Sequence, residues 1–170
     1  MHNKRLLTLI GFTAIGLAHW FFGNLYETVV FTPNTLTDPA AALTRWNAFM
    51  RLSNPIWYYI PLSPLTFLAS VTAYWLGRDQ EPVLRRWLLR TMLLTTLATL
   101  LTVYIVTQIN LNVFFSGMDL EANRDRVNAM VWRGIPFGLT RLVAAGTGLF
   151  AGLRTYLLLQ TYRLLPHDNA

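Results

Sequence analysis

The sequence lacks cysteine entirely, and among its 170 residues it has one lysine and only eight acidic residues. Without thiols the chain forms no disulfide, no iron–sulfur cluster and no thiolate metal site. Charged residues make up 13% of the chain, and almost all of them lie between or beside apolar runs. The net charge of +6 therefore does not indicate a nucleic-acid-binding patch. We expect stability to come from helix packing.

Long apolar runs are what the sequence has instead. Hydrophobic residues make up 54% of the chain, and the mean hydropathy is +0.37, which is more apolar than an ordinary soluble domain. A helix needs about 20 apolar residues to cross a bilayer. Four segments reach that length: Leu6 to about Tyr26, Ile56–Leu76, about Met92–Phe115, and Ile135 to about Leu159. The loops are too short for another domain, so we predict one all-α domain over residues 1–170, a four-helix up-and-down transmembrane bundle in the lipid bilayer.

Basic residues near the span ends predict the orientation. Eight lie on the side of the termini and the second loop (Lys4, Arg5, Arg78, Arg85, Arg86, Arg90, Arg154 and Arg163), and five lie opposite (Arg45, Arg51, Arg124, Arg126 and Arg133). The positive-inside rule then places both termini in the cytoplasm of a multi-pass protein, which we expect in a bacterial inner membrane. The first run continues through "WFFGNLY", as a span does and a cleaved signal peptide does not.

Two segments outside the regular span pattern also carry predictions. In the first outer loop, Asp38 followed by Pro39 is typical of a helix start, so a short helix is expected at the outer surface or capping the bundle. Pro61 and Pro64 predict a kink or an opened turn in the second span, which is a usual way to make a pocket.

The fourth span is rich in small residues. Gly134 and Gly138 have GxxxG spacing, and Ala144, Gly148 and Gly152 repeat every four residues. Such spacing lets a neighbouring helix approach closely. Tight packing inside the bundle is the first interpretation, and a homodimer through this helix is the alternative.

Each span brings one polar side chain to a similar depth. From a rise of about 1.5 Å per residue, His19, Ser63, Gln108 and Arg141 all lie roughly 10 Å below the outer surface. Nearer that surface are Asn24, Glu27, Asn110 and Asn112, with Asn54 in the loop. Trp20, Asn24 and Glu27 share one helix face, and Tyr104, Gln108 and Asn112 form a similar stripe. These residues predict a polar chamber in the outer half.

Arg141 is the most informative of these residues. A guanidinium inside a span needs a partner, and Glu27 is the only acid within or adjoining any span. We predict an Arg141–Glu27 ion pair. The alternative is that Arg141 reaches the outer surface along its own aliphatic stem.

His19 is a weak candidate for a metal ligand. Haem held by two histidines needs a second intramembrane histidine, and His2 and His167 lie in the tails. The sequence also lacks the two-histidine, one-carboxylate set of a non-haem iron site. We therefore expect no metal and no cofactor, and His19 is either a structural hydrogen-bonding residue or a proton-transfer or ligand contact.

Three stretches carry a resemblance to a known family. They are "RWNAFMRLSNPIWYY", "TQINLNVFF" and "NAMVWRGIPFGLTR", whose matching positions are Asn54, Pro55, Asn110, Asn112, Trp132 and Arg141. They resemble the small four-helix membrane proteins that include the fungal anthrone oxygenases, over the second to fourth spans. The resemblance implies a cofactor-independent oxygenase, or a relative that kept the fold without that activity.

These observations leave two kinds of function open. In the first, a hydrophobic aromatic or quinone-like molecule is oxidised, with His19 or Glu27 as the base and Arg141 or Asn110 stabilising an oxyanion. The substrate-binding residues would be Trp20, Asn24, Asn54, Tyr104, Gln108, Asn110, Asn112 and Trp132. In the second, the protein binds a lipid or small amphiphile without chemistry, or serves efflux or complex assembly.

Overall fold

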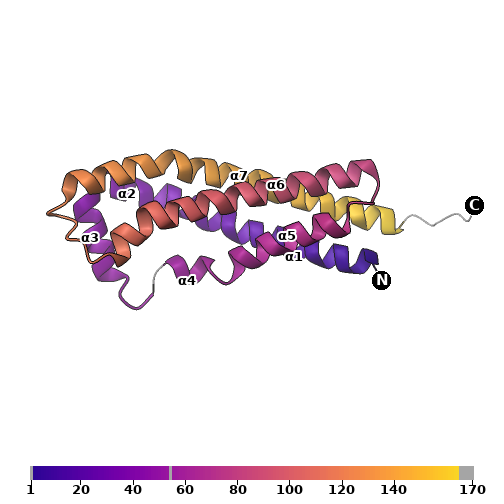
Figure 1. The fold of residues 1–170 in the computed structure, drawn as a ribbon, viewed down its shortest axis with the longest axis horizontal. Coiled ribbons are helices and arrows are strands. Elements are labelled where there is room, and N and C mark those ends of the chain that lie inside the picture. The colour runs from indigo at the N-terminus through magenta and orange to yellow at the C-terminus, as the bar shows by residue number, and fades with distance from the viewer. Residues whose placement is uncertain (1, 54, 165–170) are drawn as a thin grey trace, which may run out of the picture.

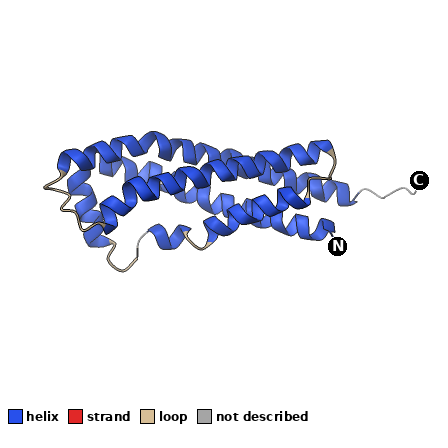
Figure 2. Ribbon diagram, in the orientation of Figure 1, coloured by secondary structure: helices blue, strands red, loops and turns tan. Residues whose placement is uncertain are grey.

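The computed structural model describes residues 2–53 and 55–164, and over these residues it contains helices and no strands (Figure 2). Three helical stretches are long and apolar enough to cross a membrane, namely Lys4–Leu36, Pro82–Phe115 and Arg124–Tyr162. The predicted all-α class is therefore confirmed, together with an apolar helix in the place of the first, third and fourth predicted spans.

The first helical stretch continues past its predicted end. α1 (His2–Tyr26) passes into a π-helical segment, η1 (Glu27–Phe31), and then into α2 (Thr32–Leu36). The backbone N–H of Thr32 donates to the carbonyl of Glu27, five residues earlier, and the Thr32 hydroxyl donates to the same oxygen at 3.2 Å. Because this wider turn precedes Pro33, the chain stays helical although proline has no N–H to donate.

The predicted second span is interrupted. The chain forms α4 (Pro55–Tyr59), turns at residues 60 and 61, and resumes as α5 (Leu62–Leu76). Pro61 and Pro64 lack the N–H groups that a continuous helix would use here, and of the expected kink or opened turn the structure shows an opened turn. The 15 residues of α5 are fewer than the roughly 20 that a bilayer crossing needs.

The other two long stretches also differ in detail from the prediction. α6 (Pro82–Ile105) ends in a second π-helical segment, η2 (Val106–Phe115). α7 (Arg124–Leu164) has 41 residues and begins well before the predicted Ile135. At about 1.5 Å per residue it is roughly 60 Å long, which is twice the length that crossing a hydrocarbon core requires.

The helices pack in a ring of neighbours. α1 contacts α5 and α7, and α6 contacts the same two helices, so the four helices form a closed ring (Figure 1). The start of α1 and the end of α7 lie at one end of the molecule, and α3 (Pro39–Phe49) closes the other end. The chain reaches this far end twice, first over η1 to α4 and then at η2, which brings η1, α4 and η2 together there.

The molecule carries large apolar side chains on its exterior as well as in its core. Most of the buried polar side chains are small hydroxyls, namely Thr13, Thr66, Ser70, Thr91, Thr95 and Thr155, and Asn24 joins them. The exposed positions of all four packed helices carry large apolar side chains, among them Ile15, Phe22, Leu68, Trp75, Leu100, Val143 and Phe150. The threonine hydroxyls bond to carbonyls of the preceding turn, which satisfies them inside the helix pack. Large apolar side chains facing outward are what a lipid environment favours.

Glycines of α7 pack against neighbouring helices of the same chain. A Cβ on Gly148 would lie 3.3 Å from Leu94 and 3.5 Å from Leu17, and one on Gly152 would lie 3.7 Å from Ala14. These glycines therefore serve contacts within the molecule. A homodimer through this helix stays a prediction.

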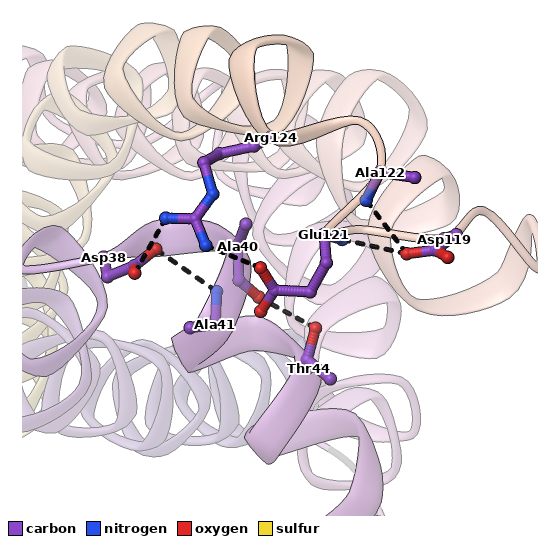
Figure 3. Close-up of polar contacts among 8 residues, drawn as sticks. All are labelled: Asp38, Ala40, Ala41, Thr44, Asp119, Glu121, Ala122 and Arg124. Atoms are coloured by element: carbon purple, nitrogen blue, oxygen red, sulfur yellow. Dashed lines mark hydrogen bonds and ion pairs between the residues drawn. The ribbon is translucent and has the colours of Figure 1, made fainter.

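The α3 helix begins as its sequence predicts. The Asp38 carboxylate accepts from the Ala41 N–H at 3.4 Å, with Pro39 in the first turn. The same carboxylate accepts from Arg124 at 2.9 Å, and Arg124 also donates to Glu121 at 2.7 Å (Figure 3). Arg124 thus ties the start of α3 to the start of α7.

Acidification should weaken this tie. The Arg124 hydrogen bond, with that from Ala41, holds the pKa of Asp38 below its usual value. The tie therefore stabilises the fold above the unfolded-state pKa of about 4 and is lost as pH falls through the lower folded-state value. We expect the exchange protection of the Ala41 amide to fall over that range. In Asp38→Asn the fall should be smaller, and an unchanged fall would contradict the assignment.

Candidate functional site

A cavity of about 610 Å³ lies between η1, the α4–α5 turn, η2 and the first half of α7, at the end of the molecule that α3 closes. Its walls are mostly aliphatic and aromatic, and the aromatic ones include Trp20, Phe31, Trp46, Tyr59 and Phe114. The volume falls in the range of about 300–1,000 Å³ that is usual for small-molecule sites.

Both π-helical segments border this cavity. η1 contributes Glu27, Thr28 and Phe31, and η2 contributes residues from Val106 to Phe114, among them Asn110. π-Helical residues are well under about 1% of residues in proteins and are frequent at functional sites. Their wider turn shifts which side chains face inward, so these two segments shape the cavity wall.

An ion pair lies in the wall of the cavity. Arg141 on α7 donates from Nη2 to Glu27 Oε2 at 3.2 Å, which confirms the pair that the sequence predicts. The Arg141 side chain is 12% exposed and that of Glu27 is 30% exposed, so the arginine is the more covered partner and the carboxylate is the more open one. Tyr59 on α4 donates a further hydrogen bond to the carboxylate. Among the described lining residues, these two carry the only charges.

Trp20 and Asn110 also line the cavity. Trp20 is 1% exposed and packs against Ala98 and Ala144, between α6 and α7. Its indole Nε1 has no hydrogen-bond partner among the described residues, and the same is true of Arg141 Nε. Four of the predicted site residues, Trp20, Glu27, Asn110 and Arg141, are therefore brought together.

His19 holds α4 in place. Its Nε2 lies 3.0 Å from the backbone oxygen of Tyr58, and its ring stacks on the Tyr58 ring with centroids 3.9 Å apart. The Tyr58 hydroxyl donates to the His19 carbonyl at 3.4 Å. The Tyr58 carbonyl stands just before the break, where the helix ladder is interrupted, so a side-chain donor is needed there. His19 is not among the residues that line the cavity.

Asn24 is the most deeply buried polar residue of the predicted chamber. It is 1% exposed, and neither its amide oxygen nor its amide nitrogen has a partner among the described residues. It lies one turn from Trp20 on α1 and does not line the cavity.

The predicted stripe on the third span faces elsewhere. Tyr104, Gln108 and Asn112 line a second cavity of about 320 Å³, beside Arg126 and Arg133 of α7. Asn112 donates to the Gln108 carbonyl at 3.1 Å, and the Tyr104 ring packs 4.3 Å from that of Phe137. Trp132 is 57% exposed on α7. Asn54 lies outside the described residues.

Sequence reasoning missed Tyr59 and a set of threonines in the larger cavity, namely Thr28, Thr32, Thr35, Thr99 and Thr102. The one available signal for Tyr59 was its spacing of four residues from Ser63, which also lines the cavity. A Cβ on Gly23 would lie 2.7 Å from the Tyr59 hydroxyl, so this glycine lets the tyrosine approach α1.

The chemistry available here is that of a carboxylate in an apolar cavity, paired with an arginine that can stabilise negative charge. No group of three His, Asp or Glu side chains that could hold a metal occurs among the described residues. Protein-family models, curated proteins and solved structures were each compared with the chain, and none of the three comparisons finds a match.

Proposed function

We propose that this chain is an integral membrane protein that crosses the bilayer four times and binds a hydrophobic small molecule in the larger cavity. The broken helix α4–α5 would make the second crossing. Its exposed Leu65, Leu68 and Trp75 and its contacts with α1 and α6 support this. The uneven distribution of basic residues supports cytoplasmic termini.

The observation that carries the binding proposal is the Glu27–Arg141 pair in the wall of an otherwise apolar cavity. A charge pair in a hydrophobic setting is costly and is usually kept for a function. The two π-helical segments and the interruption between α4 and α5 meet at this same place. Each of them lacks the regular hydrogen bonding of an α-helix, which is the backbone of lower energy.

Filling the cavity should weaken binding. A Cβ on Gly138 would meet no atom within 4 Å, so the Phe side chain of Gly138→Phe should enter the cavity without displacing the backbone. We expect binding of a naphthalene-sized probe, measured by tryptophan quenching in nanodiscs, to weaken about tenfold or more, which corresponds to 1.4 kcal/mol.

The control is Val143→Phe, on the same helix. Val143 is 63% exposed and does not line the cavity, so this variant should bind the probe as the wild type does. Equal binding by the wild type and Gly138→Phe would contradict the assignment of the site.

A second function, cofactor-independent oxidation, is favoured by the position of Glu27. Its carboxylate borders the cavity and would remove a proton from an activated CH₂ group, while Arg141 stabilises the resulting oxyanion. The carbanion would then react with O₂, so that CH₂ and O₂ give C=O and H₂O. The family resemblance supports the same chemistry.

Its test is oxygen uptake by the purified protein with polycyclic ketones that carry an activated CH₂ group in the ring. Glu27→Gln should abolish oxygen uptake. His19→Ala should lower oxygen uptake less, because His19 does not line the cavity and affects it only by holding α4 in place through Tyr58. Uptake that survives Glu27→Gln would exclude Glu27 as the base.

A further inference from the structure

We infer that the second cavity binds the phosphate group of an anionic phospholipid such as phosphatidylglycerol. This cavity has a volume of about 320 Å³, and its polar lining residues are Tyr104, Gln108 and Asn112 from α6 and η2 and Arg126 and Arg133 from α7. The site rests on the proposed function only for the membrane location of the chain. It is independent of what the larger cavity binds.

Two arginines of α7 line this cavity together. Arg126 and Arg133 are seven residues apart, which is about two helical turns, so they lie on one side of the helix. The apolar residues of the lining are Ile109, Ala129 and Met130. Among the described lining residues there is no acid, so the cavity carries two positive charges and no negative one.

Neither guanidinium is neutralised within the part of the chain that the structure describes. The ion pairs found there do not include Arg126 or Arg133. Acids at this end of the molecule have other partners: Arg124 for Asp38 and Glu121, and the backbone N–H groups of residues 121 and 122 for Asp119 (Figure 3). Asp125 directly precedes Arg126 in α7, and successive side chains of a helix do not face each other.

Two unpaired guanidinium groups favour a phosphate as the occupant. Arginine binds phosphate oxygens through two parallel N–H···O hydrogen bonds, and the second positive charge is close enough to act on the same anion. Basic pockets between membrane helices bind the headgroups of anionic lipids in the same way. The choline group of phosphatidylcholine is itself a cation, so the two arginines disfavour it.

The uncharged polar groups of the cavity suit a glycerol headgroup. The Asn112 amide nitrogen donates to the Gln108 carbonyl at 3.1 Å and to the Thr107 carbonyl at 3.4 Å, so its amide oxygen is left as an acceptor. The Gln108 amide and the Tyr104 hydroxyl can each donate and accept. Glycerol hydroxyls also donate and accept, so a phosphoglycerol group engages these side chains where a bare phosphate engages mainly the arginines.

The position of the cavity favours a lipid over a soluble phosphate. The apolar run of the fourth span begins at Ile135, two residues after Arg133, and Trp132 is exposed beside it. Exposed tryptophan is typical of the membrane–water interface. On α6, Leu100 lies one turn from Tyr104 on the same side and is 63% exposed. An acyl chain can therefore continue along this apolar surface from a headgroup held at the arginines.

The test is native mass spectrometry of the protein released from nanodiscs that contain phosphatidylglycerol and phosphatidylcholine in equal parts. We expect the wild type to retain phosphatidylglycerol in preference. The double variant Arg126→Gln/Arg133→Gln should lose roughly 25-fold of this preference, about fivefold for each arginine. Each single variant should lose about fivefold, and both arginines are exposed, so the fold should tolerate the change.

The matched control is the double variant Arg45→Gln/Arg51→Gln. It removes the same charge from the same predicted side of the membrane, but neither residue lines the cavity, so the lipid preference should stay as in the wild type. A wild type without preference, or an equal loss in the two double variants, would overturn the site, because surface charge in general would then account for the lipid.

A second measurement separates the lipid from a soluble phosphate. Thermal unfolding in detergent micelles is followed with phosphatidylglycerol or with inorganic phosphate, and potassium chloride at the same ionic strength is the reference. We expect stabilisation by phosphatidylglycerol alone. Stabilisation by inorganic phosphate that Arg126→Gln/Arg133→Gln removes would overturn the lipid and assign the cavity to a soluble phosphate.

Binding of the naphthalene-sized probe distinguishes this site from the larger cavity. Neither Arg126 nor Arg133 is among the described residues that line the larger cavity, so the double variant should bind the probe as the wild type does. A missing lipid preference with intact probe binding would therefore overturn the phosphate site and leave the proposed function standing.

Discussion

Arg141→Met should destabilise the protein by about 3 kcal/mol, at the low end of the range for breaking a buried ion pair. Removing the guanidinium leaves the Glu27 carboxylate with Tyr59 as its remaining described donor, in a wall that is otherwise apolar. An unpaired charge there cannot be resolvated fully. The measurement is reversible unfolding by denaturant in detergent micelles.

Glu27→Gln is the matching change on the other side of the pair. It should cost less, because the Gln carbonyl still accepts from Arg141 Nη2. The double variant should recover part of the loss, with a coupling of about 0.5–3 kcal/mol in the mutant cycle. Strictly additive losses would mean that the two side chains do not interact, and that Arg141 instead reaches the outer surface.

Gly16→Ala should also be strongly destabilising, by about 1–3 kcal/mol from overpacking. A Cβ at this position would clash with Thr66 Oγ1 and would lie 2.9 Å from Thr66 Cβ. Thr66 is fully buried, and its hydroxyl donates to the Leu62 carbonyl at 2.7 Å, so it cannot turn away freely. The new methyl group therefore forces α1 and α5 apart.

The matched control for this change is Gly138→Ala. A Cβ there would meet nothing within 4 Å, so the substitution should gain the helix preference of alanine, about 0.5–1 kcal/mol. Unfolding of the two variants under one condition compares the same chemical change in a crowded and an open position. If Gly16→Ala is as stable as the wild type, α1 and α5 are not in close contact at this residue.

Some of the site followed from single residues. An arginine and one acid in a chain with so little intramembrane charge have few other partners, so Glu27 and Arg141 were predicted to pair and they do. Asp38 followed by Pro39 marks a helix start wherever it occurs, and α3 begins there. In each case the reason is local chemistry or a scarcity of alternatives.

Other parts needed the packed structure. Tyr104, Gln108 and Asn112 do lie together on one side of the third stretch, but packing turns that side toward Arg126 and Arg133 of α7 instead of the larger cavity. Asn110 lines the larger cavity in their place. The sequence predicts His19 as a residue of the polar chamber. In the structure it contacts the Tyr58 carbonyl of α4 instead, and the sequence does not indicate that this carbonyl lies nearby.

By itself, then, the sequence determined that the chain is helical and suited to a membrane, where its helices break, and which charges pair, because length, proline and charge act through local or unique interactions. The tertiary structure alone decided how each helix is rotated about its axis. Since apolar residues occur on every face of these helices, no hydrophobic stripe specifies that rotation. It therefore took the packing of η1, α4 and η2 to place Glu27, Tyr59 and Asn110 around one cavity.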